Sequence, residues 1–81
     1  MTIRELWTQL VADYALSSAW LAEELAAATV TAAVVDGATT ITATTGSPAL
    51  PWLQRCGKVA SRKASAIAGR RVRVEFVGVE L

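Results

Sequence analysis

The sequence predicts a small α+β domain in which a three-stranded sheet packs against helices in the order α-α-β-β-α-β. Apolar residues recur at helical spacing over residues 3–28, and residues 29–45 then become rich in β-branched residues. Helical spacing returns after residue 47, and strict alternation from Arg71 to Phe76 predicts a last strand. We therefore expect one domain, residues 1–81, near the lower size limit for a core without disulfides or metals.

The first helix begins with a capping box, because Thr2 and Glu5 can each bond the other's backbone amide. An apolar stripe about three turns long follows at helical spacing. Two readings of Trp7 stay open: it lies at the edge of the core, or it is an exposed anchor for a partner, since tryptophan is enriched in interface hot spots. The stripe consists of Ile3, Leu6, Trp7, Leu10, Val11 and Tyr14.

Ser17-Ser18 is expected to end the first helix and to cap a second helix over residues 19–28. Glu23 and Glu24 lie on its outer side. Adjacent acids on a short helix form a solvated face or, if a basic partner exists, an acidic docking site. The apolar positions expected on this helix are Trp20, Leu21, Leu25 and Ala28.

Residues 29–45 read as a β-hairpin. The β-branched run of residues 29–35 predicts one strand, and residues 38–45 predict its return. Asp36-Gly37 between them suits a type I′ turn, which needs positive φ at both positions. In the second strand we expect Ile41 and Ala43 to face inward and the threonines to face outward, namely Thr40, Thr42 and Thr44.

The third helix is expected to begin near Leu50, with Pro51 at its first position and Ser47 available as a cap. Gly57 weakens its middle by about 1 kcal/mol relative to alanine. Gly69 is placed to end it as a left-handed residue. The expected buried stripe consists of Trp52, Leu53, Cys56, Val59, Ala60, Ala64 and Ile67.

Charge is distributed unevenly along the chain. Residues 1–54 carry one arginine against five acids, whereas residues 55–81 carry seven bases against two acids. Such asymmetry suits weak self-association or docking to a charged partner. On the third helix a ridge of bases could contact phosphates, although without interleaved aromatics a solvated outer face is the alternative. This ridge consists of Arg55, Lys58, Arg62 and Lys63.

The residue types offer no catalytic constellation. Histidine is absent, and Cys56, the one cysteine, lacks a base to activate it. We therefore expect no enzyme, no metal and no cofactor. The longest apolar stretch, residues 25–35, is too short to span a bilayer, so a cytoplasmic protein without membrane contact is expected. In the last strand, Val72, Val74 and Phe76 should face inward, and residues 77–81 can extend it.

Four features in this order resemble the N-terminal domain of the bacterial chromosomal replication initiator DnaA. The resemblance covers essentially the whole chain. The KH fold also mixes three strands and three helices, but its phosphate-clamping GxxG loop is absent here. The features are Leu6-Trp7, the hairpin at Asp36-Gly37, Trp52-Leu53, and Gly69 followed by Val72, Val74 and Phe76.

The resemblance implies a protein-interaction module that self-associates and binds the replicative helicase or initiation regulators. It implies self-association around Trp7, and helicase contact near Glu23 and Glu24 and at Pro48, where the family carries an aromatic. The family's second-helix tryptophan falls near Glu24, with Trp20 displaced by about one turn, and Gly57 replaces another aromatic.

Complete initiators also carry a P-loop ATPase, and no P-loop motif occurs in these 81 residues. The chain is then either the first domain of a longer initiator or a stand-alone relative. A stand-alone relative would be a helicase-loading factor or an adaptor of a phage or mobile element. The alternative function, independent of the resemblance, is a small nucleic-acid-binding domain that uses the basic third helix.

Overall fold

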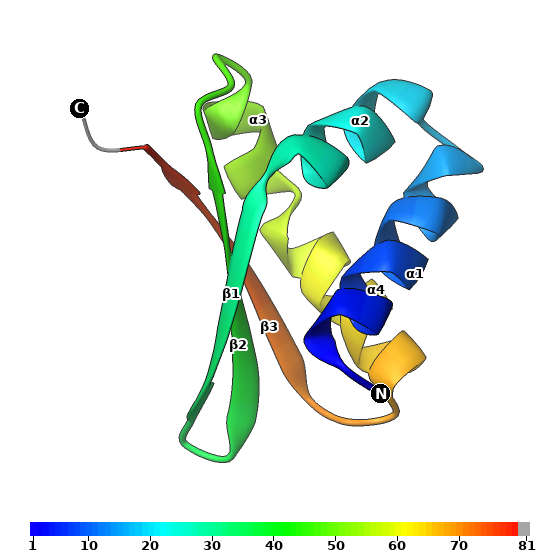
Figure 1. The fold of residues 1–81 in the computed structure, drawn as a ribbon, viewed down its shortest axis with the longest axis vertical. Coiled ribbons are helices and arrows are strands. Elements are labelled where there is room, and N and C mark those ends of the chain that lie inside the picture. The colour runs from blue at the N-terminus through cyan, green and yellow to red at the C-terminus, as the bar shows by residue number, and fades with distance from the viewer. Residues whose placement is uncertain (80–81) are drawn as a thin grey trace.

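A computed structural model describes residues 1–79, which form four helices and a three-stranded sheet (Figure 1). The predicted α+β class and order of elements are confirmed, with the third predicted helix divided in two. The elements are α1 (Ile3–Ala15), α2 (Ala19–Ala27), β1 (Thr29–Val35), β2 (Ala38–Thr45), α3 (Leu50–Arg55), α4 (Gly57–Ala68) and β3 (Val72–Gly78).

The sheet has β2 at its centre, antiparallel to β1 and parallel to β3. The helices cover one face of this sheet and leave the other open (Figure 1). Ile41 and Ala43 of β2 are fully buried beneath the helices, as their alternation predicted. The predicted outward threonines of β2 are half-buried on the open face. The part of the last strand predicted beyond residue 79 lies outside the described residues.

The hairpin turn has the predicted conformation. Asp36 has φ 51° and Gly37 has φ 78°, so both turn residues are left-handed, as a type I′ turn requires. The turn sets the register in which Val35 pairs with Ala38 and Ala32 with Ile41. It therefore decides which side chains of β1 share a face with the buried side chains of β2.

The predicted caps of α1, α2 and α4 are present, whereas Ser47 does not cap α3, whose N-cap residue is Ala49 without a side-chain cap hydrogen bond. The Thr2 hydroxyl accepts from the Glu5 amide at 3.1 Å, and the Glu5 carboxylate accepts from the Thr2 amide at 3.2 Å. The Ser18 hydroxyl accepts from the Leu21 amide at the start of α2. Gly69 ends α4 with φ 67°, a conformation that costs glycine little.

The prediction of one continuous third helix is wrong. The helix is interrupted at Cys56, which has φ −81° and ψ −6° and separates α3 from α4. Gly57 follows immediately, and because glycine has a low helix propensity, interrupting the helix here costs little free energy. The division lets α3 and α4 each pack on β3. Pro51 takes the second helical position, after Leu50, rather than the first.

Three large residues expected in the buried stripes are exposed instead, namely Trp20, Trp52 and Val59. Trp20 and Trp52 each precede a leucine, Leu21 or Leu53, that is buried in their place. Neighbouring helical residues point about 100° apart, so a narrow helix face accommodates only one of each pair. On α4 the buried residues are Ala60 and Ala64, both of which were expected in the buried stripe.

The core therefore lies between the helix layer and the inner face of β2 and β3. Its largest fully buried side chains come from three helices and the central strand: Leu6, Leu10, Leu25, Leu53 and Ile41. Inward residues of β3 complete it, as predicted: Val72, Val74 and Phe76. Within residues 1–79 no helix has both the length and the apolar character needed to cross a membrane.

Candidate partner-binding surfaces

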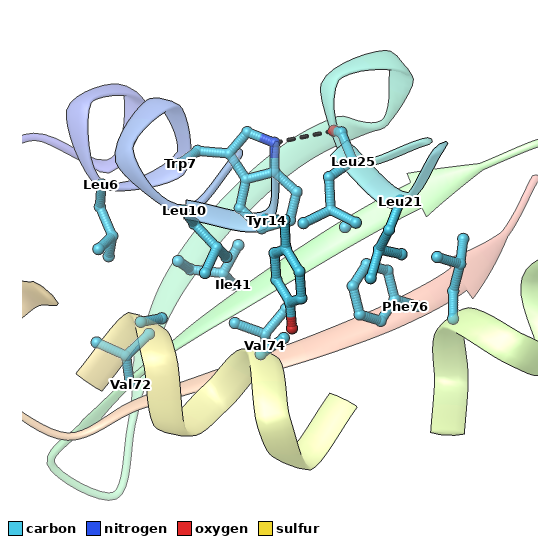
Figure 2. Close-up of a cluster of buried hydrophobic side chains, with 14 of the residues drawn as sticks. Leu6, Trp7, Leu10, Tyr14, Leu21, Leu25, Ile41, Val72, Val74 and Phe76 are labelled. Carbon is cyan, nitrogen blue, oxygen red and sulfur yellow. Dashed lines mark hydrogen bonds between the residues drawn. The ribbon is translucent and has the colours of Figure 1, made fainter. Parts of the chain in front are cut away.

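Trp7 lies at the edge of the core, which is the first of its two readings. Only 8% of its surface is exposed, and its indole Nε1 donates to the Leu25 carbonyl oxygen at 3.0 Å (Figure 2). This bond joins the first turns of α1 to the last turn of α2. Contact between Trp7 and a partner stays a prediction, and it is restricted to the small part of the ring that remains accessible.

That accessible part opens onto a groove of about 530 Å³ between α1, the end of α2 and β1. We call it the α1–β1 groove. Its walls combine apolar side chains with polar groups, among them those of Arg4 and Thr8. The lining residues are Ile3, Arg4, Trp7, Thr8, Ala26, Ala28 and Val30. The groove brings the first helix beside an edge strand, a juxtaposition that the sequence pattern does not predict.

The predicted acidic and loop contacts lie at one end of the molecule. Glu23 on α2 is exposed and Glu24 is half-buried. Pro48 is exposed in the loop before α3, where the Ser47 hydroxyl accepts from the Ala49 amide. Figure 1 shows α2 and this loop at the same end of the sheet.

Two exposed tryptophans lie on α2 and α3, and sequence reasoning placed both in the core. Trp20 is 47% exposed on α2, and Trp52 is 53% exposed on α3. Large exposed aromatics are typical of interface hot spots. Each lies beside a leucine, Leu21 or Leu53, that is buried, and spacing within a helix does not show which member of such a pair faces the core. We call Trp20, Glu23, Glu24, Pro48 and Trp52 the α2–α3 surface.

The predicted basic ridge is divided between α3 and α4, and one of its members, Lys63, pairs with an acid of α1. Arg55 lies on α3, on the far side of the break at Cys56. Lys63 points toward α1, where its Nζ lies 2.7 Å from the Asp13 carboxylate and 5.3 Å from the centre of the Tyr14 ring. Lys58 and Arg62 remain exposed, one turn apart on α4.

A different set of bases does come together, along the β3 side of the molecule. Lys58 and Arg62 line a shallow groove of about 490 Å³ with Arg71 and Arg73. Glu75 also lines it, 3.9 Å from the Arg73 guanidinium. We call this the α4–β3 basic groove. The sequence placed Arg71 and Arg73 on the wet side of the strand, but not next to α4.

Tyr14 is the one described residue with a buried polar side-chain atom that lacks a hydrogen-bond partner within residues 1–79. Burial, followed by the nearby Cys56 thiol and Asp13 carboxylate, raises the pKa of Tyr14 above its usual value of 10.0. The hydroxyl is therefore neutral at physiological pH. Among the described residues no three acids or cysteines gather in a way that could hold a metal ion.

Comparison with protein-family models, with curated proteins and with solved structures finds no match to this chain. The resemblance to the initiator domain therefore rests on the order of elements and on the positions of a few residues.

Proposed function

We propose that this domain is a cytoplasmic protein-interaction module of DNA replication initiation. In this proposal it self-associates weakly and binds the replicative helicase or a regulator of initiation. The observation that carries the proposal is the α-α-β-β-α-β fold with Leu6-Trp7 in the first helix and Trp52-Leu53 opening the third. The domain contributes binding and no chemistry.

The α2–α3 surface is the proposed docking site for the helicase or regulator. It combines two half-exposed indole rings with the carboxylates of Glu23 and Glu24. Aromatic groups can supply most of the affinity, and charges at the rim favour a partner of opposite charge. The occupant that fits is a basic surface of the partner protein.

Reversing the charge at this surface is expected to weaken binding. The variant Glu23→Lys with Glu24→Lys should lose at least about tenfold in affinity for the replicative helicase of the same organism, because attraction to a basic partner becomes repulsion. Isothermal titration calorimetry measures the change. Glu75→Lys, on the open face of β3, is the matched control and should bind as the wild type does. If the wild-type domain shows no helicase or regulator binding, the proposal is wrong.

A second candidate function is binding of single-stranded nucleic acid, and the α4–β3 basic groove favours it. Two bases of α4, one base of β3 and Arg71, just before β3, line one groove, which is an arrangement that can follow a phosphate backbone.

If the groove binds nucleic acid, reversing two of its charges should reduce that binding. The variant Lys58→Glu with Arg62→Glu should weaken single-stranded DNA binding by at least about tenfold at low salt and flatten its salt dependence. Fluorescence anisotropy with a labelled oligonucleotide measures both. Lys63→Ala is the control, because Lys63 pairs with Asp13 outside the groove. Equal binding by the double variant and by the wild type would exclude the groove as the binding site.

A further inference from the structure

The two edges of the sheet are finished differently. At the β3 edge, the Val72 amide donates to the Ser65 hydroxyl at 2.9 Å and the Val74 amide donates to the Ser61 hydroxyl at 2.8 Å. Gln54 donates from Nε2 to the Phe76 carbonyl oxygen at 3.3 Å. Side chains of α3 and α4 therefore occupy the positions that another strand would take.

The β1 edge has no such cover. Within residues 1–79, no hydrogen bond beyond the β1–β2 ladder reaches residues 29–35. In a two-residue hairpin the residues flanking the turn, Val35 and Ala38, form a hydrogen-bonded pair. Alternate residues then turn both backbone groups outward, which leaves Val30, Ala32 and Val34 with free N–H and C=O groups.

The β1 strand also lacks the features that normally prevent edges from pairing. It contains no charged residue and no proline, and it is rich in β-branched residues. Val34 is 75% exposed although its position in the ladder puts it on the inner face of the sheet. Edge strands of soluble proteins usually carry lysine, proline or a bulge to prevent pairing. An open edge of this kind is therefore available to pair with another strand.

We propose that β1 pairs with β1 of a second copy, antiparallel about a two-fold axis at Ala32. The pairing joins the two sheets into one and forms about six backbone hydrogen bonds through the outward groups. It rests on the self-association in the proposed function and gives that self-association a surface other than Trp7.

The occupant is a second copy because the strand complements itself in this register. Val30 lies opposite Val34 of the partner on the inner face, and Ala32 lies opposite Ala32 of the partner. A two-fold axis produces each contact twice, as an isologous interface requires. The valine contacts extend the apolar inner face across the junction, so β-branched side chains pair across the new strands.

Charge complementarity supports the same register. It sets Asp36 opposite Ala28 of the partner, and Ala28 lines the α1–β1 groove together with Arg4. Asp36 forms no ion pair within residues 1–79. The register thus brings the Asp36 carboxylate, which also lines a hollow with Arg71 and Arg73 of its own chain, toward an arginine of the other copy at each end of the paired strands.

Val34→Lys tests the pairing. It places a cation opposite Val30 of the partner and close to Arg4 of the partner, so the dimer should weaken by at least about tenfold in sedimentation velocity. Val35→Lys is the matched control. Val35 lies in the same strand with its side chain on the open face, away from the valine contacts and Arg4, and this variant should weaken the dimer much less than Val34→Lys does. Circular dichroism confirms that both variants are folded.

A cysteine at the proposed axis tests the register directly. In a Cys56→Ser background, Ala32→Cys should give a disulfide-linked dimer under mild oxidation, because directly opposed residues lie within disulfide reach. Ala12→Cys, exposed on α1, should give none. Cross-linking at both positions or at neither would overturn the proposed register.

The outcomes separate this inference from the proposed partner. A wild-type domain that stays monomeric at millimolar concentration but binds helicase overturns the β1 pairing alone. A dimer sensitive to Val34→Lys that binds neither helicase nor regulator overturns the replication role alone. Equal dimerisation by Val34→Lys and by Val35→Lys would place self-association elsewhere on the molecule.

Discussion

Replacing Trp7 by alanine is expected to lower the free energy of unfolding by about 3 to 5 kcal/mol. The ring is 8% exposed and packs between α1 and α2, so its removal leaves a large cavity. The substitution also leaves the Leu25 carbonyl oxygen without the indole donor that it has at 3.0 Å. Small domains are stable by only about 5 to 15 kcal/mol, so much of the stability depends on this one side chain.

Urea denaturation measures the free energy of unfolding of Trp7→Ala and of two comparison variants, Trp20→Ala and Trp52→Ala. Trp20→Ala and Trp52→Ala remove rings that are about half exposed, and each should cost about 1 kcal/mol or less. Trp7→Phe keeps most of the apolar volume and loses the N–H, which isolates the hydrogen bond. If Trp7→Ala proved as stable as Trp20→Ala, the ring would not be part of the core. Because Trp7→Ala is expected to destabilise the fold, its loss of dimerisation would not identify an interface.

Local signals were sufficient to predict most of the fold. The capping box at Thr2, the type I′ turn at Asp36-Gly37 and the left-handed Gly69 each depend on interactions within a few residues. All three are present where the sequence places them. The alternation in β2 and β3 also predicted the buried face, because the period of a strand is independent of its neighbours.

The orientation of the tryptophans could not be predicted in the same way. Each of the pairs Leu6-Trp7, Trp20-Leu21 and Trp52-Leu53 offers a leucine and a tryptophan to a neighbouring layer. Which residue of a pair is buried depends on the element that packs against the helix, and the periodicity of the helix itself does not reveal that element. Trp7 is buried beside its leucine because α2 supplies a carbonyl oxygen for its N–H. Trp20 and Trp52 are left half exposed.

Which basic residues share a surface could not be predicted either, because their neighbours come from distant parts of the chain. Lys63 has a place in the helical ridge by sequence spacing, but its partner Asp13 lies 50 residues earlier in the chain. Arg71 and Arg73 join the groove only because β3 runs beside α4. Contacts between distant segments, rather than spacing along one helix, decide which charges share a surface.

The second large effect on the free energy of unfolding is expected at the β3 edge, where two serines of α4 bond the strand. Ser61 and Ser65, one turn apart on α4, act as substitutes for a neighbouring strand. The residues whose amides they accept from, Val72 and Val74, are each 3% exposed. Removing a hydroxyl would leave a largely buried donor without its partner, which costs about 1 to 3 kcal/mol. The two sites are therefore expected to contribute to stability well beyond what two serines on a helix surface normally would.

The variant Ser61→Ala with Ser65→Ala is expected to lose about 2 to 6 kcal/mol of stability, with each single variant near half of that. Alanine is the better helix former, so propensity alone predicts a gain, and the sign of the change separates the two effects. Amide hydrogen exchange at Val72 and Val74 should accelerate in step with the loss. Thr8→Ala is the control, because the Thr8 hydroxyl donates only to the Arg4 carbonyl oxygen on the exposed side of α1. A double variant as stable as Thr8→Ala would mean that water replaces both hydroxyls, and that the β3 edge is open, as the β1 edge is.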